Sequence, residues 1–587
     1  MTTEEIMSEW LNHPDVDEQT KDEIQSFAHD QGEVNDRFLQ YVTFGTGGIR
    51  ALLGAGTNRI NLYTIRRATQ GLSNYICKQD NDPLKGVVIA YDSRHQSELL
   101  AKEAACTLVA NGIKVFLFDG IRPTPELSFA VRKMGAAAGI VITASHNPAT
   151  YNGYKVYGSD GGQITSGVAK DIAEEIASLG TFQGVKTASF AAACESGLLH
   201  TVGEEMDQLY LSRLADVTLQ PERLKECAAD LSIVYSPLHG TGIVLVPKAL
   251  SQWGFANVHV VQEQAVCDPE FSTVRSPNPE EDAAFSYALS LAEAKQGDVI
   301  LLTDPDCDRV GVMSKSSSGE YIRLTGNQVG ALLLDYVLSA KARAGKLQER
   351  SAMITTIVTS EIGSAIAAKY GVETIKTLTG FKYIAEWIQQ FEEEESKTFV
   401  FGYEESCGYL ADPFVREKDG VMASALICEM AAFYKQQGKT LVDKLQDIYT
   451  EHGYYLEATV SRTLEGTNGQ EKMKDIMAYF DDCPLHQIGE REISHICKYQ
   501  QQTEVNVRTG EHSVIPLPTE NAIQFRLVDG SWFCIRPSGT EPKLKIYFSV
   551  QATSEDQARK KMSLLQHEVM KRIDDLLCCD GQENKGM

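Results

Sequence analysis

The sequence predicts an α/β protein of several sheets, followed by a C-terminal α+β region with an antiparallel sheet. Short apolar runs, polar loops and helical patterns recur along most of the chain, which is typical of parallel sheets built from βα units. A length of 587 residues exceeds a single hydrophobic core and suggests roughly three to five domains. Near the C-terminus, FRLVDGSWFCIRP alternates around an Asp-Gly turn, which indicates antiparallel strands.

The predicted elements follow in chain order. Residues 1–40 are polar and helix-like, and the glycine-rich loop FGTGGIR then carries Arg50. Thr553 and Ser554, with Gln557, predict the start of a closing helix. Open α/β sheets bind ligands at the carboxyl ends of their strands, so polar loops at these ends are expected to face one cleft. Strands that precede such loops are predicted at 87–90, 139–142, 233–234, 299–302 and 399–401.

The amino-acid composition limits the classes of partner that the protein can bind. With 80 acidic and 55 basic residues, the net charge is −25, which disfavours binding to a nucleic-acid backbone. An anionic substrate therefore requires a locally basic site. The N-terminus, MTTEEIMSEW, is unlike a signal peptide, and no apolar stretch is long enough to span a bilayer, so we expect a soluble cytoplasmic protein without a membrane partner. The 13 scattered cysteines form no C-x-x-C pair and support neither a disulfide framework nor a zinc site.

The loop TDPDCDR predicts a metal site. Asp304, Asp306 and Asp308 lie at alternate positions after an apolar strand, and carboxylates so close together repel one another unless a cation neutralises them. An EF-hand is excluded, because Arg309 and Lys315 occupy the positions where it needs glycine and an acid. Oxygen ligands with open positions suit Mg²⁺ shared with a phosphoryl group, while a solvated acidic turn is the alternative.

The loop ITASHNPATYNGYKVYG places Ser145 just past a predicted strand. It lacks the G-x-S-x-G pattern of a hydrolase nucleophile, and the adjacent His146 is poorly placed by sequence to act as the base. Ser145 fits better as a phosphoryl carrier whose oxygens complete the metal shell. A plain turn is the alternative, since Ser and Asn-Pro are ordinary turn residues.

Two further loops contain polar groups suited to a sugar phosphate. Glu404 and Glu405, in GYEESCGY, follow a predicted strand, where carboxylates can accept hydrogen bonds from sugar hydroxyls or act as general acid and base. Paired glutamates are also common on exposed helices. In the loop RPSGTEPK, an arginine, hydroxyls, a glycine and a lysine form a cradle for phosphate; a β-turn is the alternative, and no Walker loop is present. The cradle residues are Arg536, Ser538, Gly539, Thr540 and Lys543.

Taken together, TASHNP, DPDCDR, GYEES and RPSGTEPK resemble the α-D-phosphohexomutase family in order and spacing, and FGTGGIR is similar to its leading basic loop. The resemblance is closest to the bacterial α-phosphoglucomutase and phosphopentomutase branch. It implies four domains around a central cleft: three mixed α/β domains and a C-terminal α+β domain that closes over the substrate. The expected domains are 1–205 (phosphoserine loop), 206–315 (metal loop), 316–450 (sugar loop) and 451–587 (phosphate loop).

The resemblance also implies roles for individual residues. Ser145 is the residue phosphorylated in the active enzyme, and it shares Mg²⁺ with the three aspartates. Arg309 neutralises the transferring phosphoryl group, Glu404 and Ser406 contact sugar hydroxyls, and the RPSGTEPK loop holds the other phosphate. Some family members carry a histidine in the sugar loop, where the corresponding stretch of this chain reads Ser406-Cys407-Gly408-Tyr409. Positive or proton-transferring positions match Arg50, His146 and Lys382, and proton transfer is assigned to either Lys382 or His146.

The implied activity is interconversion of glucose 1-phosphate and glucose 6-phosphate, with glucose 1,6-bisphosphate as intermediate and activator. Within the class, the alternatives are a phosphopentomutase, a phosphomannomutase or a sugar bisphosphate synthase. Outside it, they are a metal-dependent phosphatase or a non-catalytic sugar-phosphate binding protein. The partner is a small sugar phosphate rather than a nucleic acid, and the chain is expected to be a monomer or a homodimer.

Overall fold

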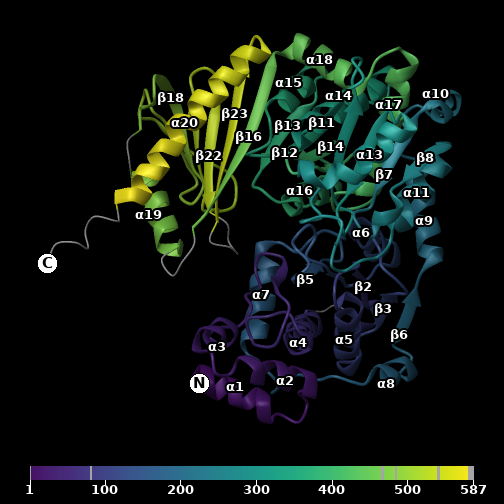
Figure 1. Cartoon of the computed structure of the whole chain (residues 1–587), viewed down its shortest axis with the longest axis vertical. Helices are drawn as coiled ribbons and strands as arrows, with labels where there is room; N and C mark the ends of the chain where they lie inside the picture. Colours follow the sequence, from purple (N-terminus) through teal and green to yellow (C-terminus); the bar gives the residue numbers. More distant parts are fainter. Residues whose placement is uncertain (1, 80–81, 465–468, 483–484, 538–542, 580–587) are drawn as a thin grey trace.

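The computed structural model describes residues 2–79, 82–464, 469–482, 485–537 and 543–579. Four sheets follow one another along the chain. They form an arc in which the first and the last sheet lie at opposite ends (Figure 1). Among the described residues, no helix combines the length and apolar character needed to cross a membrane.

Three helices precede the first sheet and have a small core of their own. Trp10 is fully buried and meets the rings of Phe38 and Tyr63 edge-on, so the polar N-terminal segment is anchored by aromatic packing. Asp17 and Asp30 accept hydrogen bonds from backbone N–H groups of the first turn of the second and third helix. The helices are α1 (Thr3–Asn12), α2 (Glu18–Phe27) and α3 (Gln31–Phe38).

The first sheet has the strand order β1-β5-β4-β2-β3-β6, in which β4, β2, β3 and β6 are parallel. Alternate residues of its central strand enter two cores: Val88 packs with one helical layer, and Ile89 packs with the other. A sheet buried on both faces explains the unbroken apolar runs in the sequence. Its elements are β1 (Gly48–Leu52), α4 (Leu62–Lys78), η1 (Pro83–Lys85), β2 (Val87–Tyr91), α5 (Ser97–Ala110), β3 (Val115–Phe118), α6 (Thr124–Met134), β4 (Ala138–Ile142), β5 (Tyr151–Tyr157), α7 (Ser166–Ala177), α8 (Phe190–Glu195) and β6 (Leu199–Val202).

The second sheet has the order β11-β10-β9-β7-β8 and carries the aspartate loop between its antiparallel neighbours β9 and β10. Its last strand lies beyond residue 315, where a domain boundary is predicted. The elements are α9 (Glu204–Ala215), α10 (Pro221–Cys227), η2 (Ala228–Asp230), β7 (Ser232–Ser236), α11 (Gly242–Gln252), β8 (Asn257–Val260), α12 (Gln262–Ala265), η3 (Asp282–Phe285), α13 (Ser286–Lys295), β9 (Val299–Thr303), β10 (Val310–Lys315) and β11 (Tyr321–Leu324).

The third sheet has the order β13-β12-β14-β15, with β13, β12 and β14 parallel. One continuous apolar core links the helices of the first three domains, so these domains are packed as a unit. The elements are α14 (Gly326–Arg343), β12 (Ser351–Thr356), α15 (Ile362–Lys369), β13 (Glu373–Thr377), α16 (Phe381–Glu394), β14 (Thr398–Glu404), β15 (Gly408–Leu410), α17 (Gly420–Gln436) and α18 (Leu441–His452).

The C-terminal sheet is antiparallel, with the order β16-β23-β22-β21-β18-β19-β20 and β17 paired to β18. Phe533 faces a core beneath α19 and α20, whereas Trp532 packs toward Ile357 and Val358 of the third domain. The elements are β16 (Tyr454–Thr463), α19 (Gly469–Asp482), β17 (Gln487–Ile488), β18 (Arg491–Lys498), β19 (Thr503–Asn506), β20 (His512–Val514), β21 (Ile523–Leu527), β22 (Trp532–Pro537), β23 (Lys543–Ala552) and α20 (Glu555–Cys579).

The structure confirms the predicted fold class. The five apolar runs form β2, β4, β7, β9 and β14, and the Asp-Gly turn joins β21 to β22 with Gly530 at φ +83°. Gln557 donates its backbone N–H to Ser554 Oγ at the start of α20. The exact domain boundaries remain a prediction.

Candidate active site

Ser145 lies in the turn that follows β4 and is 3% exposed. Its φ of +52° is in the left-handed region, and its backbone N–H donates to Thr143 Oγ1 over 2.8 Å. The hydroxyl donates to Asp304 Oδ2 at 2.7 Å. The serine loop of the first domain and the aspartate loop of the second therefore meet at this hydrogen bond.

Arg94 fixes the backbone of the serine loop through hydrogen bonds. Its guanidinium donates to the carbonyl oxygens of Ser145, Asn147, Pro148 and Tyr151. Asp92 orients Arg94 through an ion pair of 3.3 Å, and both side chains are fully buried. Because four carbonyls share one planar donor group, the backbone around Ser145 is fixed before any ligand binds.

The three aspartates form a buried cluster. One oxygen from each of Asp304, Asp306 and Asp308 lies within 4.8 Å of the others. Asp304 Oδ1 accepts the backbone N–H groups of Asp308 and Arg309, both at 3.1 Å. Thr124 of the first domain donates its backbone N–H to the carbonyl of Asp306 at 2.9 Å. Contacts from two domains therefore set the shape of the loop.

Three cations surround this cluster. Lys155 Nζ lies 2.7 Å from Asp306 Oδ2, and Lys418 Nζ lies 3.0 Å from Asp308 Oδ2. Arg309 pairs with Glu280. Burial and the neighbouring carboxylates raise the pKa of Asp304 well above its usual range, whereas Lys155, acting against burial, lowers the pKa of Asp306.

The aspartate residues fit a bound cation. Asp306 Oδ1 and Asp308 Oδ1 are buried and have no hydrogen-bond partner. Buried carboxylate oxygens are rarely left without a partner, and three clustered oxygen ligands match the donors that hard divalent cations prefer. The cluster can therefore hold a metal ion, and Ser145 Oγ lies beside it.

His146 and Arg50 both contact residues of the serine loop. His146 Nδ1 lies 3.2 Å from Ser145 Oγ, a contact that sequence position alone did not suggest. Burial and the positive charges of Arg309 and Arg50 lower the pKa of His146 well below its usual range. Arg50 on β1 donates to Asn147 Oδ1 at 3.1 Å.

The sugar-loop residues lie at the end of β14. Glu404 is 5% exposed, and its Oε1 accepts the backbone N–H of Gly380 at 2.9 Å. Ser406 is half-buried in the same turn. A Cβ at Gly408 would lie 2.1 Å from Lys418 Cδ, so a larger residue at this position would force the Lys418 side chain to shift.

The predicted phosphate cradle is only partly described. Ser538, Gly539 and Thr540 lie outside the described residues. Arg536 donates to Glu520, and Lys543 begins β23 half-buried. Lys545, two residues further along the same strand, interacts electrostatically with Glu280 and Arg309 of the second domain.

Lys382 contacts the leading loop of the first domain. It is the second residue of α16, and its ammonium donates to the carbonyl of Thr46 at 2.8 Å. Burial lowers its pKa to about 8. Lys382 is therefore hydrogen-bonded to the backbone of the FGTGGIR loop.

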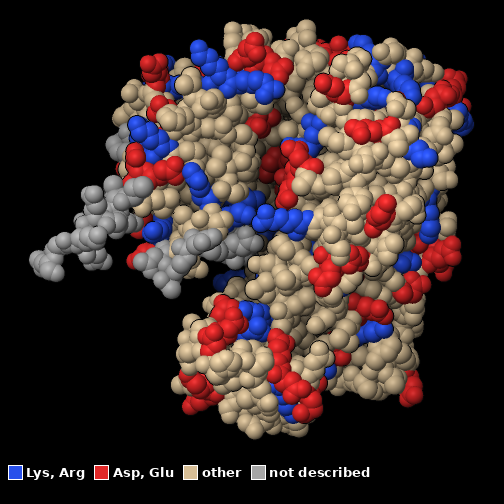
Figure 2. Space-filling model, viewed as in Figure 1, with Lys and Arg blue, Asp and Glu red and all other residues tan. Residues whose placement is uncertain are grey.

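A cleft of about 710 Å³ opens beside these residues, between the first domain and α19. Arg50, Lys155 and Lys474 line it, and no carboxylate is among its described lining residues. The space-filling view shows Lys and Arg side chains gathered at a hollow between the two ends of the arc (Figure 2). In a chain with net charge −25, this local basic lining favours an anionic ligand.

Sequence reasoning missed four residues at this site: Arg94, Lys155, Lys418 and Lys545. Lys418 follows Arg416 and Glu417, a run of charges placed directly before the apolar helix α17. Charges next to a fully buried helix indicate paired groups, and that signal could have identified Lys418. Arg94 and Lys155 became recognisable only through their contacts in space.

Profiles for all four domains of one family match the chain. They are described as phosphoglucomutase/phosphomannomutase alpha/beta/alpha domains I, II and III and the C-terminal domain, and they match residues 42–182, 208–318, 325–452 and 494–565.

Curated relatives match over most of the chain. A phosphoglucomutase of Staphylococcus aureus (strain MSSA476) is 36% identical over 544 residues, covering 92% of this chain and 96% of the relative. A phosphoglucomutase of Staphylococcus haemolyticus is 36% identical over 520 residues, covering 89% of this chain and 92% of the relative.

Solved structures share the fold. Parafusin, an exocytosis-sensitive phosphoprotein and phosphoglucomutase from Paramecium, has a TM-score of 0.67 at 17% identity, covering 92% of this chain and 96% of its own. A phosphoglucomutase/phosphomannomutase family protein from Burkholderia thailandensis has a TM-score of 0.63 at 18% identity. The match covers 91% of this chain and 97% of the Burkholderia chain.

Proposed function

Because the chain belongs to the phosphoglucomutase/phosphomannomutase family, we propose that it is a phosphoglucomutase that interconverts glucose 1-phosphate and glucose 6-phosphate. The observation that carries the proposal is the 2.7 Å hydrogen bond from Ser145 Oγ to Asp304, which joins the phosphoryl-carrier candidate to the buried carboxylate cluster. The basic cleft supports a phosphorylated substrate.

In the proposed reaction, Ser145 carries a phosphoryl group. A sugar hydroxyl attacks phosphorus, the bond from phosphorus to Ser145 Oγ breaks, and glucose 1,6-bisphosphate forms. The sugar oxygen releases one proton, and Ser145 Oγ gains one. His146 Nδ1 lies within hydrogen-bond reach of this oxygen, so the neutral ring can hydrogen-bond to the serine hydroxyl that forms.

The bisphosphate then turns end for end within the cleft, and its other phosphoryl group returns to Ser145. Arg309 lies beside the aspartates and offsets negative charge, while Glu404 and Ser406 bind sugar hydroxyls. Arg536, Ser538, Gly539, Thr540 and Lys543 hold the phosphate that is not being transferred. Lys382 supports the leading loop that carries Arg50.

We assign Mg²⁺ to Asp304, Asp306 and Asp308, with a phosphoryl oxygen on Ser145 as a further ligand. When bound, the ion would offset the charge that develops on the transferring phosphoryl oxygens. Lys155 pairs with Asp306 and Lys418 pairs with Asp308, and these ion pairs stabilise the conformation of the aspartate loop.

The C-terminal domain excludes water. Water in the cleft would accept the phosphoryl group and convert a mutase into a phosphatase, so closure of this domain protects the intermediate.

We place the enzyme in the cytoplasm, as a monomer or homodimer, with domains at 1–205, 206–315, 316–450 and 451–587. Glucose 1,6-bisphosphate acts as activator by rephosphorylating Ser145.

Two measurements test this function. Intact mass should show one added phosphoryl group, absent in Ser145→Ala and retained in the exposed control Ser26→Ala. Ser145→Ala should lose nearly all turnover; retained hydrolysis would indicate a phosphatase, and a wild type without turnover would indicate a binding protein.

The substrate requires a separate comparison. Catalytic efficiency should be highest for glucose 1-phosphate in a panel that includes mannose, ribose and deoxyribose 1-phosphates. A clear preference for a pentose 1-phosphate would make the protein a phosphopentomutase, a preference for mannose a phosphomannomutase, and accumulation of bisphosphate a bisphosphate synthase.

A further inference from the structure

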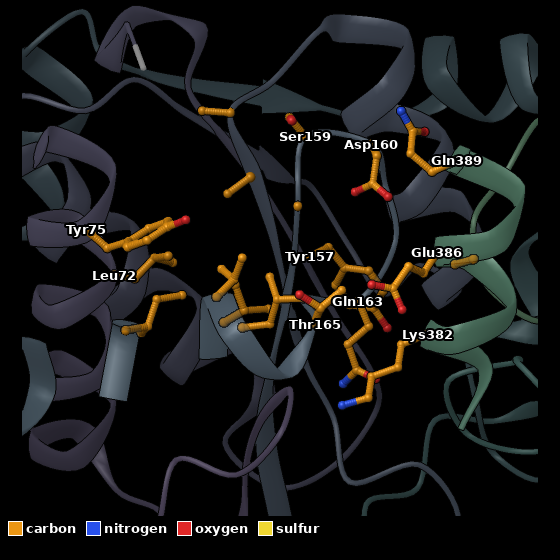
Figure 3. Close-up of a pocket in the computed structure, with 18 of the residues that line it drawn as sticks. Leu72, Tyr75, Tyr157, Ser159, Asp160, Gln163, Thr165, Lys382, Glu386 and Gln389 are labelled. Atoms are coloured by element: carbon orange, nitrogen blue, oxygen red, sulfur yellow. The ribbon is translucent and has the colours of Figure 1, made fainter. Parts of the chain in front are cut away.

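A second cavity lies between the first and third domains. It is open to solvent, has a volume of about 450 Å³ and is bounded by α4, α7, the segment after β5 and α16. Figure 3 shows apolar side chains such as Leu72 on one side and polar side chains, including Asp160, Glu386 and Gln389, on the other. The cavity therefore has an apolar end and a polar end.

The polar end is acidic and rich in acceptors. Asp160, Glu386 and Glu393 line it, with Lys382 as the single cation among the lining residues that the structure describes. Gln389 Oε1 is buried and has no hydrogen-bond partner. This charge is opposite to that of the substrate cleft, whose described lining residues include three cations and no carboxylate.

The acceptors define the complementary ligand. A primary ammonium has three N–H donors and one positive charge, which match the carboxylates of Asp160 and Glu386. Burial raises the pKa of both Asp160 and Glu386, so their charged forms gain from an incoming cation. The opposite end, which Leu72, Ile76 and Val168 line, suits an apolar body.

The cavity is also connected to the substrate cleft. Gln163 lines both, and its Nε2 donates to the carbonyl of Gly47 at 3.2 Å. Lys382 lines the cavity and donates to the carbonyl of Thr46 at 2.8 Å. The leading loop of the cleft therefore rests on two side chains that an occupant of the cavity would contact.

We propose that this cavity is a second ligand site, which binds a small primary amine with an apolar body and is coupled through Gln163 and Lys382 to the loop 45–48. Its ammonium lies between Asp160 and Glu386, and its apolar part lies against α4 and α7. The site would allow an amine to alter the substrate cleft without entering it.

Binding is tested by calorimetry with tryptamine, with the neutral alcohol tryptophol and the anion indole-3-acetate as analogues. Tryptamine should bind saturably and about tenfold more tightly than either analogue, because only it carries the ammonium. Equal binding of tryptamine and tryptophol, or no saturable binding of tryptamine, would overturn the proposal.

Variants locate the site. Asp160→Asn with Glu386→Gln should weaken tryptamine about tenfold, since it removes both carboxylate partners. The matched control is Asp171→Asn with Glu174→Gln, which removes two exposed acids of α7 that do not line the cavity and should leave affinity unchanged. Val168→Trp should block the apolar end. If both double variants behave alike, tryptamine binds elsewhere and the proposal is wrong.

Coupling is tested by amide hydrogen exchange. Saturating tryptamine should change exchange in residues 45–48 of the wild type and not in the Asp160→Asn/Glu386→Gln variant. Unchanged exchange would refute the coupling. Neither measurement depends on turnover, so a failure of the proposed mutase activity is distinguishable from a failure of this site.

Discussion

Lys155 of β5 holds its ammonium 2.7 Å from Asp306 Oδ2, so the first sheet neutralises a carboxylate of the second. Lys155→Met leaves this buried carboxylate without that partner and should lower the free energy of unfolding by about 3 kcal/mol. Lys155→Arg keeps the charge and should retain most of the stability. Denaturant unfolding without added metal measures the effect, with the exposed Lys170→Met as control. An unchanged midpoint in Lys155→Met would show that the pair contributes nothing.

Arg94 is a positioning residue for the serine loop, because it donates to four of the loop's carbonyl oxygens. Arg94→Lys keeps the positive charge but loses the planar guanidinium that donates to several carbonyls at once. We expect turnover to fall about 100-fold, with the KM for glucose 1-phosphate changed less. Phosphorylation of Ser145, followed by intact mass, should fall in parallel. The exposed Arg462→Lys serves as control. Wild-type turnover in Arg94→Lys would contradict the positioning role.

Asp306→Asn tests the metal site. Removing one of three clustered carboxylates should weaken Mg²⁺ binding by at least about tenfold, since hard cations bind anionic oxygen ligands. Calorimetry on the variant and the wild type measures this, and chelation should abolish turnover of the wild type reversibly. The matched control is the exposed Asp216→Asn. Equal affinity in Asp306→Asn and the wild type would exclude this carboxylate as a ligand.

Glu429 predicts a pH dependence of stability. Burial raises its pKa to about 7, and in the folded protein it accepts hydrogen bonds from the backbone N–H groups of Leu219 and Gln220. The folded protein thus binds a proton that the unfolded chain releases near pH 4.5, so this contribution to stability is present below that pH and is lost as pH rises through about 7. The cost of the charged form is about 3 kcal/mol.

Glu429→Gln removes this titration. The stability of the variant relative to the wild type should therefore rise by about 3 kcal/mol between pH 4 and pH 8. Unfolding midpoints across this range measure the change, and the exposed Glu222→Gln provides the baseline. A difference that does not vary with pH would mean that Glu429 keeps an ordinary pKa.

Gly408→Ala tests the packing beneath Lys418. The added Cβ would lie 2.1 Å from Lys418 Cδ, so the Lys418 side chain must shift, and we expect this shift to disturb its 3.0 Å pair with Asp308. We expect turnover to fall about tenfold or more, because one charge next to the aspartate loop is displaced. Gly167→Ala in α7, where nothing lies within 4 Å, should preserve turnover. Steady-state kinetics of both variants measure the difference in turnover. Full activity in Gly408→Ala would show that the present position of Lys418 is not needed for turnover.

Local sequence patterns were enough to predict some of the site residues. Asp304, Asp306 and Asp308 lie within five residues, so their mutual repulsion and their need for a cation are local properties of the sequence. Ser145 was recognisable as a strand-end residue because the apolar run before it has the length and composition of a buried strand. The same reasoning located β2, β7, β9 and β14 and therefore the fold class.

Other features depend on contacts between distant residues. Lys155 and Asp306 are 151 positions apart, and Tyr157 and Glu417, which share a buried hydrogen bond, are 260 apart. No local periodicity encodes which buried charge meets which partner, because pairing depends on how whole domains pack.

The sequence by itself determined the strand-and-helix order and the chemistry of each loop, since both follow from residues that are neighbours in the chain. Only the tertiary structure decided that Ser145 meets Asp304, that His146 reaches the serine hydroxyl and that Arg94 fixes the loop beneath them. The physical reason is that burial removes water from these groups, so each must find its partner across a domain boundary or a turn rather than along the chain.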